Sequence, residues 1–397
     1  MLGELACRAV WGSRVAAILL VSAALPGCGA GADPTPPSPS PQAVDPATGQ
    51  PAAPPGVSGL PMAATKNTTR IGGADPIARA AAAALAVHPS GSTASRPRAV
   101  TLVDQANWAG AISAAQLAGL GAPTLLVDGA GVPAPTSAAL ALLRPAGSRF
   151  LGGAQAVRVG TAVRAPGLSD INVEGADPAA LARGIDALRT RAVGEPNRSV
   201  IVASLDSPAY AMPAAGWAAK SGDPVLWVRR GEVPPDTVAA IRAREDPRIY
   251  VIGPPEAIGE AVVQRLGRLG DVTRIDGPDP VRNAIAFARF RDGDFGWGVV
   301  DPGHGMVLAT SAQPADAAAG AALSAAGTYG PLLLLDGGEP PTAVRAYLLD
   351  IRPGYESDPV RGVYNHAWLM GDATAISVRT QSRIDSLLEI QPVDLTP

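Results

Sequence analysis

Cysteine is nearly absent from this 397-residue chain, which holds only Cys7 and Cys28, both close to the amino end. Two such thiols cannot build a disulfide framework or a thiolate metal site in the body of the protein. Aromatic residues make up 4% of the chain and charged residues 17%, which excludes a highly charged, disordered chain. Lysine is equally scarce, because Lys66 and Lys220 are the only two lysines among 32 basic residues.

The net charge is small and negative. The formal charge is −3 at pH 7, with a pI near 5.7, whereas a nucleic-acid binder needs a basic surface to displace counterions. We therefore expect no nucleic-acid partner. Hydrophobic residues make up 47% of the chain, which permits sizeable cores of Ala, Val and Leu. The length suits two or three domains at roughly 100–200 residues per domain.

Residues 1–27 have the pattern of an export signal. Arg8 and Arg14 precede an apolar run over Val15–Leu25, which has the length of a secretory signal and is too short to span a bilayer as a helix. The run ends in Leu-Pro-Gly before Cys28, which resembles a bacterial lipobox and predicts lipidation of that cysteine; ordinary secretion with a free thiol is the alternative. We expect an exported protein with a lipid anchor in the cell membrane, on its extracytoplasmic face.

A proline-rich stretch follows the cysteine. Residues 28–66 are rich in Pro, Ala, Gly and Ser and have no apolar periodicity, which is typical of an extended, polyproline-like tether. We expect this tether to hold the folded part away from the membrane, in the cell wall.

The remainder of the chain repeats itself. A block with Gly, Asp and Pro at fixed positions recurs at a constant interval, at Asp75, Asp177 and Asp279. Asp suits a helix N-cap and Pro the first helical position, so we interpret these residues as structural, with a functional Asp as the alternative. The interval predicts three repeats, over residues 67–168, 169–270 and 271–397.

Each repeat continues with the same order of patterns. A helix, a buried strand, a small-residue helix, a strand that opens with proline and a third helix precede a last strand that closes on glycine. This order predicts an α/β fold of three Rossmann-like repeats with parallel sheets. The last strands are expected at Phe150–Gly153, Tyr250–Gly253 and Trp368–Gly371. The insertion Ile351–Asn365 is peculiar to the third repeat, where it could cap the module, contact a partner or form a disordered loop.

Three motifs occur in a fixed order in the first repeat. They are an Arg-Ile-x-Gly-x-Asp opening at Arg70, a proline followed by leucines at Pro123, and a strand that ends in two glycines at Gly153. Over residues 67–397 the chain therefore resembles the cell wall binding repeat type 2 family. The resemblance implies a pseudo-threefold module that attaches surface proteins to anionic polymers of the bacterial wall.

Candidate binding residues follow from the resemblance and from position. The family ties its proline-plus-leucine segment to attachment, although a buried core strand has the same composition, and Asp316 retains one of the family's aspartates. Arg229 and Arg230 follow the second such strand, where ligands meet an open α/β sheet; they could grip a phosphate or carboxylate, or form a solvated pair. The candidate set is Pro123, Leu125, Leu126, Pro224, Leu226, Trp227, Arg229, Arg230, Pro331, Leu333, Leu334 and Asp316.

The sequence offers no catalytic set. His88, His304 and His366 share no metal-ligand spacing, and nucleophile, Walker and dinucleotide motifs are missing. We therefore expect neither an enzyme nor a cofactor. Three similar copies with differing polar residues favour a multi-point binding surface.

The resulting hypothesis is a non-enzymatic, lipid-anchored envelope protein that binds an anionic wall polymer or another envelope glycan. The alternative is a solute-binding lipoprotein that captures a small or oligomeric ligand between repeats. We also expect burial between repeats, because an isolated unit of about 100 residues with Ala-rich helices leaves apolar faces uncovered.

Overall fold

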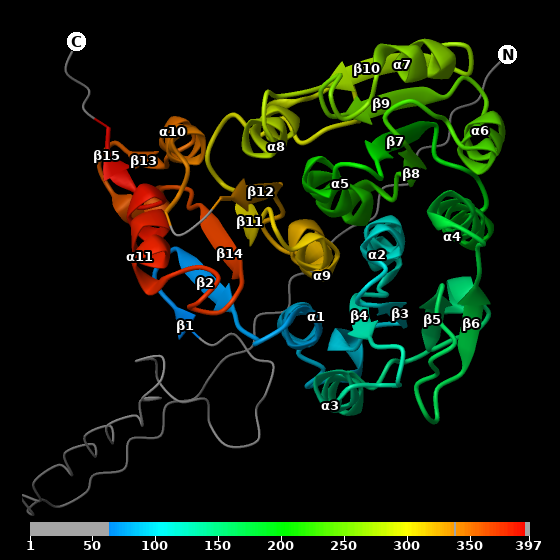
Figure 1. Ribbon diagram of the computed structural model, residues 1–397. Coiled ribbons are helices and arrows are strands. Elements are labelled where there is room, and N and C mark those ends of the chain that lie inside the picture. Colours follow the sequence, from blue (N-terminus) through cyan, green and yellow to red (C-terminus); the bar gives the residue numbers. More distant parts are fainter. Residues whose placement is uncertain (1–62, 337–338, 394–397) are drawn as a thin grey trace, which may run out of the picture. The chain divides into compact units, whose positions relative to one another are not determined.

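The computed structural model describes residues 63–336 and 339–393 (Figure 1). The export signal, Cys28 and the tether up to residue 62 lie outside the described residues. Strands and helices alternate through the described part and form parallel sheets, as expected for an α/β fold. Within these ranges no helix has the length and apolar composition to cross a membrane.

Three sheets in the described residues share one strand order. The first has the order β4-β3-β5-β6, the second β8-β7-β9-β10, and the third β12-β11-β14-β2 with a short antiparallel β1 beside β2. All other pairings in these three sheets are parallel. The strands are β1 Ala63–Ala64, β2 Thr68–Ile71, β3 Val100–Asp104, β4 Thr124–Val127, β5 Ala156–Val159, β6 Asp170–Val173, β7 Ser199–Ser204, β8 Val225–Val228, β9 Arg248–Ile252, β10 Asp271–Ile275, β11 Gly305–Thr310, β12 Leu332–Leu335 and β14 His366–Met370.

Each sheet takes its outer strand from the block that opens the next sequence repeat. Strand β6 lies just after position 169 yet pairs with β5 of the first sheet, and β10 lies after 271 yet pairs with β9. The third sheet closes the series, because β2 from the start of the described chain pairs with β14 near its end. The three sheets are therefore interlocked by exchanged strands.

The helix after each Asp-Pro begins as expected. The aspartates accept hydrogen bonds from backbone N–H groups of the first turn, and proline occupies the first helical position, which confirms the predicted N-caps. The helices are α1 Pro76–Val87 after Asp75, α4 Pro178–Val193 after Asp177 and α8 Pro280–Arg289 after Asp279, with cap distances of 2.8, 2.9 and 2.8 Å.

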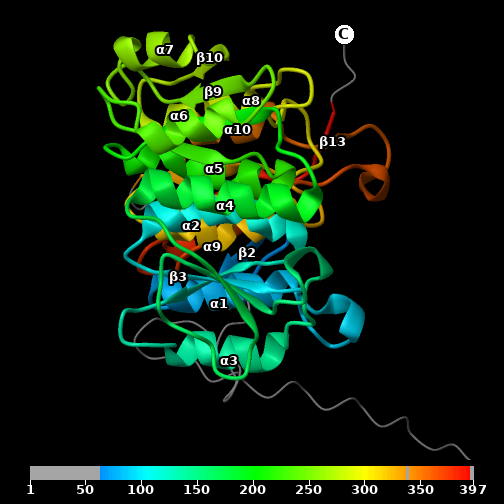
Figure 2. The same cartoon turned by 90° about the vertical axis from the view of Figure 1, so that its right-hand side faces the viewer.

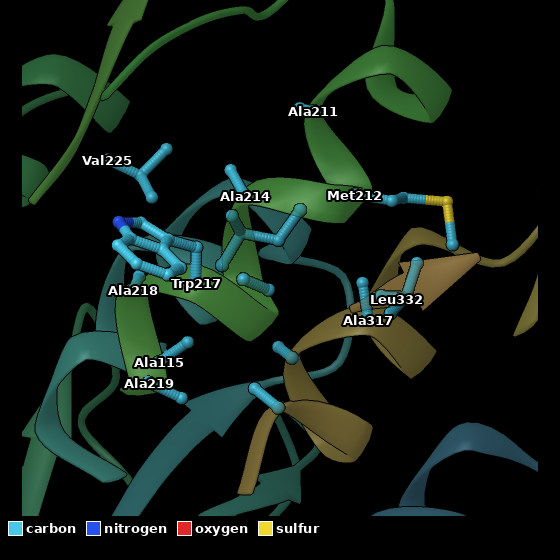
Figure 3. Close-up of a cluster of buried hydrophobic side chains, with 14 of the residues drawn as sticks. Ala115, Ala211, Met212, Ala214, Trp217, Ala218, Ala219, Val225, Ala317 and Leu332 are labelled. Atoms are coloured by element: carbon cyan, nitrogen blue, oxygen red, sulfur yellow. The ribbon is translucent and has the colours of Figure 1, made fainter. Parts of the chain in front are cut away.

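The small-residue helices meet at the centre. These are α2 Trp108–Ala114 with the short turn η2 Ala115–Leu120, α5 Pro208–Ser221 and α9 Pro314–Ala325, and they pack against one another (Figure 1). Alanine keeps their facing surfaces small, so the helices approach closely and bury each other. Figure 3 shows this contact, where Trp217 and alanines of α5 lie near Ala115 of η2 and Ala317 of α9. Burial between repeats is thus extensive, as expected.

The first helices hold neighbouring sheets together. Helix α1 packs on β4 of the first sheet and on α9 of the third, α4 packs on β8 and on α2, and α8 packs on β12 and on α5. Each of these helices therefore follows the outer strand of one sheet and packs on a strand of the next sheet. This packing connects the same sheets that the exchanged strands connect.

Aromatic side chains concentrate at the junction of the second and third sheets. The ring of Trp217 lies 5.3 Å from the rings of both Phe295 and Trp297, and its indole N–H donates to Asp223 at 2.7 Å. The loop that carries Phe295 and Trp297 separates α8 from β11, and both of these side chains are buried. A chain with few aromatic residues thus places several of them in one joint.

The remaining elements cover the outside of the sheets. Asn365, at the end of the insertion of the third repeat, accepts hydrogen bonds from the backbone of Gly303 and His304 through its amide oxygen and donates to the Ile351 carbonyl. The elements outside the three sheets and the central helices are α3 Ala134–Leu143, α6 Pro235–Arg242, α7 Glu260–Leu266, α10 Thr342–Asp350 and α11 Val378–Leu387, the strands β13 Gly354–Tyr355 and β15 Gln391–Pro392, and the short turns η1 Thr93–Ser95, η3 Arg149–Leu151 and η4 Pro359–Arg361.

The last strand of the first repeat differs from expectation. Residues Phe150–Gly153 do not form a strand: the chain makes the turn η3 and then places Gly152 and Gly153 at φ 62° and 86°. Two successive left-handed residues cannot continue an extended backbone. The strand is β5, which ends at Val159 just before Gly160, and Phe150 consequently leaves the core and is 37% exposed.

The pH dependence of stability is expected to involve His366, which joins β14 to β2 through a 3.1 Å contact with Thr69 Oγ1. Burial lowers the pKa of His366 below its ordinary value of 6.5. As the pH falls through 6.5 the unfolded histidine takes up a proton that the folded one resists, so stability is lost. The free energy of unfolding should fall between pH 7 and 5, and less so for His366→Gln.

Chemical denaturation at pH 8, 7, 6 and 5 measures this difference. At pH 8 the histidine is neutral in both states, so the comparison there isolates the packing cost of the substitution. An identical pH slope in both proteins would show that His366 does not contribute.

Candidate anion-binding site

The proline-plus-leucine strands lie in the interior. Their side chains form the cores of the three sheets, so in this fold they offer no surface to a polymer. Of the two interpretations of these segments, their placement fits that of buried core strands. Leu125, Leu126, Leu226, Trp227, Leu333 and Leu334 are all 0% exposed, and Pro123, Pro224 and Pro331 are buried as well.

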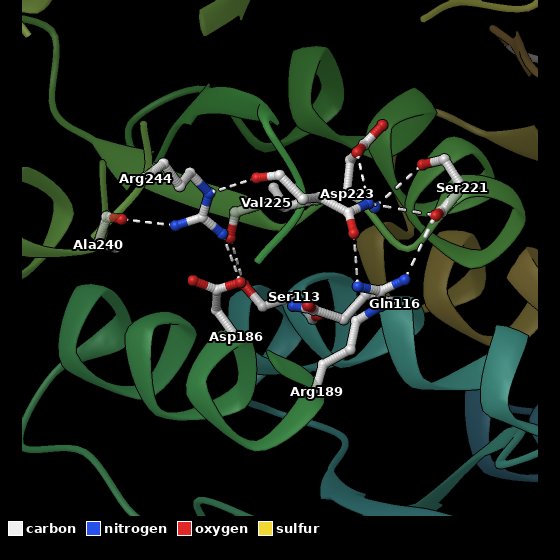
Figure 4. A network of polar contacts seen from close by, with 10 residues as sticks. Ser113, Gln116, Asp186, Arg189, Ser221, Asp223, Val225, Ala240 and Arg244 are labelled. Atoms are coloured by element: carbon white, nitrogen blue, oxygen red, sulfur yellow. Dashed lines mark hydrogen bonds and ion pairs between the residues drawn. The ribbon is translucent and has the colours of Figure 1, made fainter. Parts of the chain in front are cut away.

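Trp227 instead joins two sheets. Its indole N–H donates to Ser113 Oγ at 2.8 Å, and its ring meets Trp108 edge-on with 5.3 Å between centroids. Ser113 in turn donates to the carbonyl of Val225 at 3.0 Å, a pair labelled in Figure 4. Helix α2 is thereby fixed to strand β8, which gives this residue a structural role.

Asp316 is equally withdrawn from solvent. Its carboxylate receives a hydrogen bond from Arg79 Nε at 2.8 Å, with side-chain exposures of 2% and 5%. Burial raises the pKa of Asp316, and the guanidinium of Arg79 opposes that shift. The pair links α1 to α9, at the joint between the first and third sheets, and leaves no free charge for a ligand.

Arg229 and Arg230 do lie on the surface, after the carboxyl end of β8. Arg229 Nη1 contacts Asp206 Oδ1 at 2.8 Å, and the backbone N–H of Arg230 donates to the other oxygen of the same carboxylate at 2.9 Å. Asp206 therefore neutralises part of the charge that the pair would present to an anion.

A crevice of about 560 Å³ lies at the carboxyl ends of β5 and β6. It is lined by residues 160–162 and 174–176, among which Glu174 is the charged side chain. This is where an open α/β sheet usually meets ligands, but a carboxylate at the rim disfavours an anionic one.

The cations gather at the opposite ends of the strands. A hollow of about 590 Å³ opens between the amino ends of the first sheet and the carboxyl ends of η2, α5 and α9. We call it the basic hollow, because Arg98, Arg149 and Lys220 line it together with His88, whereas none of the described residues that line it is acidic. Partial negative charge at the ends of the central helices favours cations there.

Two exposed aromatic rings accompany these cations. The guanidinium groups of Arg98 and Arg149 lie 5.3 and 4.7 Å from the centroid of the Phe150 ring. Lys220 Nζ lies 3.8 Å above the ring of Tyr329, which is 43% exposed. Cations held against rings in this way keep their charge directed outward while their stems pack on apolar surface.

The three cations are free to meet a ligand. Arg98, Arg149 and Lys220 are exposed, and within residues 63–336 and 339–393 none of them forms an ion pair. Guanidinium groups bind phosphate or carboxylate oxygens in bidentate geometry. Burial lowers the pKa of His88 from 6.5, so at pH 7 it lines the hollow as a neutral group.

Comparison with solved structures adds a likeness of fold. Cwp6 from Clostridium difficile aligns with 81% of this chain and 48% of its own, with TM-score 0.67 and 16% identity. Cwp8 from Clostridium difficile aligns with 82% and 52%, with TM-score 0.63 and 16% identity. The fold matches that of two bacterial cell wall proteins.

The alignment covers about half of each of these structures. At 16% identity the likeness shows a shared fold. No protein-family model matches the sequence, and no curated protein matches it. The repeat family named from the sequence motifs therefore stays a prediction, while the fold class is supported.

The basic hollow was not found by sequence reasoning, which placed the ligand at the carboxyl ends of the strands. Its cations Arg98, Arg149 and Lys220 come from three distant segments, before β3, before β5 and at the end of α5. One signal was present: Lys220 is one of only two lysines in the chain. The strand predicted at Phe150–Gly153 would place Phe150 in the core, so the sequence gives no sign of its exposed ring.

Proposed function

We propose that this protein binds an anionic glycopolymer of the cell envelope through the basic hollow, without enzymatic turnover, and that Cys28 anchors it to the membrane. The observation that carries the proposal is the group of unpaired cations around the exposed ring of Phe150. The likeness to two cell wall proteins supports an envelope role.

The chemistry of the hollow suits such a ligand. Arg98 and Arg149 supply two guanidinium groups that can bind phosphate or carboxylate oxygens in bidentate geometry, and both lie against the exposed ring of Phe150. Lys220 adds a point charge from the second sheet's side. Because these groups are exposed, the attraction is screened by salt.

The double variant Arg98→Ala, Arg149→Ala is expected to lose most of its retention on purified cell-wall material. Hydrogen bonds to charged groups contribute about 1.5–3 kcal/mol each, so removal of both arginines should weaken binding by at least about tenfold. A sedimentation assay with isolated walls, at low and at high salt, measures this loss.

The matched control is Arg164→Ala, Arg282→Ala. These arginines are 68% and 57% exposed, and they lie after β5 and in the first turn of α8. Their replacement therefore removes the same charge as the test variant does, but at the other ends of the strands. The control should bind as the wild type does. Equal retention of all three proteins, or equal loss in both variants, would contradict a role for the basic hollow.

A further inference from the structure

A second hollow that gathers arginines lies at the amino ends of the second sheet. It has a volume of about 600 Å³, and Arg198, Arg242 and Arg248 line it together with Arg244, Asp246 and Asp271. We call it the second hollow. It stands at the same ends of the strands as the basic hollow, one sheet further along the chain.

The arginines of the second hollow differ in the partners that they already have within the protein. Arg244 is not available to a ligand, because its guanidinium forms an ion pair with Asp186 at 2.6 Å and its side chain is 1% exposed. Arg198 Nε donates to the carbonyl of Asp246 at 2.8 Å, and its terminal nitrogen stays 3.8 Å from that residue's carboxylate.

Arg242 is exposed in the last turn of α6 and forms no ion pair in the described part of the chain. Arg248 also lines the hollow, where its side chain contacts the hydroxyl of Tyr250 as well. Arg198, Arg242 and Arg248 together outnumber the two carboxylates of the lining, Asp246 and Asp271. The surplus of charge makes the second hollow attractive to an anion.

A side-chain contact connects the segments that carry the two hollows. Lys220 of the basic hollow precedes Ser221, whose carbonyl accepts from Asn197 Nδ2 at 3.3 Å, and Asn197 precedes Arg198 of the second hollow. Arg189, labelled in Figure 4, also donates to Asn197 at 2.7 Å. Lys220 of the basic hollow and Arg198 of the second hollow therefore stand next to this contact, one on each side of it.

We propose that the second hollow is a second subsite for the same ligand, and that the ligand is a linear polyanion with anionic groups repeated along its chain. The inference rests on the proposed function and deepens it. A single small anion can fill one hollow at a time, whereas a chain that reaches both converts the second contact into an intramolecular event. Affinity should then depend steeply on the length of the chain.

The test measures binding of inorganic phosphate, short and long linear polyphosphate, and short and long polygalacturonate to the whole protein. The wild type should bind a long chain about a hundredfold more tightly than a short one, as expected for linked contacts. Arg198→Ala, Arg242→Ala should lose that gain and keep the affinity for short chains. The arm that shows the gain identifies phosphate or carboxylate as the repeated group.

The controls separate this inference from the proposed function. Arg242→Ala alone changes an exposed side chain, so its loss of the length-dependent gain cannot be ascribed to misfolding; the Arg164→Ala, Arg282→Ala variant should keep the gain. Full length dependence in Arg198→Ala, Arg242→Ala would overturn the second subsite and leave the proposed function standing. Wild-type retention on walls without any polyanion binding would overturn the ligand class.

Discussion

Replacement of Asp316 by alanine is expected to lower the free energy of unfolding by about 3–5 kcal/mol. The substitution leaves the guanidinium of Arg79 buried without its carboxylate, at the joint between α1 and α9. One hydrogen bond remains, from Arg79 Nη1 to the carbonyl of Gly73 at 3.1 Å, and it does not neutralise the charge. Urea denaturation of both proteins measures the loss.

The chain itself supplies the control for this prediction. A Cβ placed on Gly73 would lie 2.7 Å from the backbone N of Arg79, and one on Gly175 would lie 2.3 Å from that of Leu181, so the two residues occupy equivalent places. The second repeat thus carries a leucine at the place that Arg79 occupies in the first. The double variant Arg79→Leu, Asp316→Ala removes the uncompensated charge and should recover most of the loss.

This recovery distinguishes an unpaired buried charge from lost packing. If the double variant is as unstable as Asp316→Ala, the cost arises from packing rather than from the charge. A loss below about 1 kcal/mol for the single variant would show that the pair contributes little, as exposed ion pairs do.

Residues 169–270 expressed alone are expected to remain unfolded or to aggregate. This segment contains β6, whose partner β5 is missing, and lacks β10, the outer strand of its own sheet. It also exposes the apolar faces of α4 and α5, which pack on α2, α8 and α9 in the whole chain. Circular dichroism and a denaturation curve should show no cooperative transition.

The matched control is the segment 63–393, which keeps all exchanged strands and should unfold cooperatively. A soluble, cooperative monomer of residues 169–270 would show that the sheets do not need each other's strands. Such a result would also contradict the expectation of burial between repeats.

The opening motif of the repeats shows how far sequence reasoning reached. The Asp-Pro pairs were placed correctly at helix starts, because an N-cap depends on residues a few positions apart. The role of the arginine in the same block was not foreseen. Arg70 is fully buried and donates to the carbonyls of Gly371 and Asp372 at 2.9 and 2.7 Å, far away in the sequence.

Arg274 makes the corresponding contacts in the second sheet, to the carbonyls of Gly253 and Ile258 at 2.6 and 2.9 Å. In both places the arginine fastens the loop that follows the neighbouring strand. The motif that suggested a binding family thus has a structural explanation, which no pattern within one repeat could reveal.

The sequence by itself determined the alternation of helices and strands, the buried character of the leucine strands and the helix starts, because each depends on periodicity or on neighbours along the chain. Only the tertiary structure decided which repeat supplies each outer strand and where the cations meet. Strand pairing and the gathering of Arg98, Arg149 and Lys220 join segments far apart in the sequence. Both depend on how distant parts of the chain pack together, which local patterns do not encode.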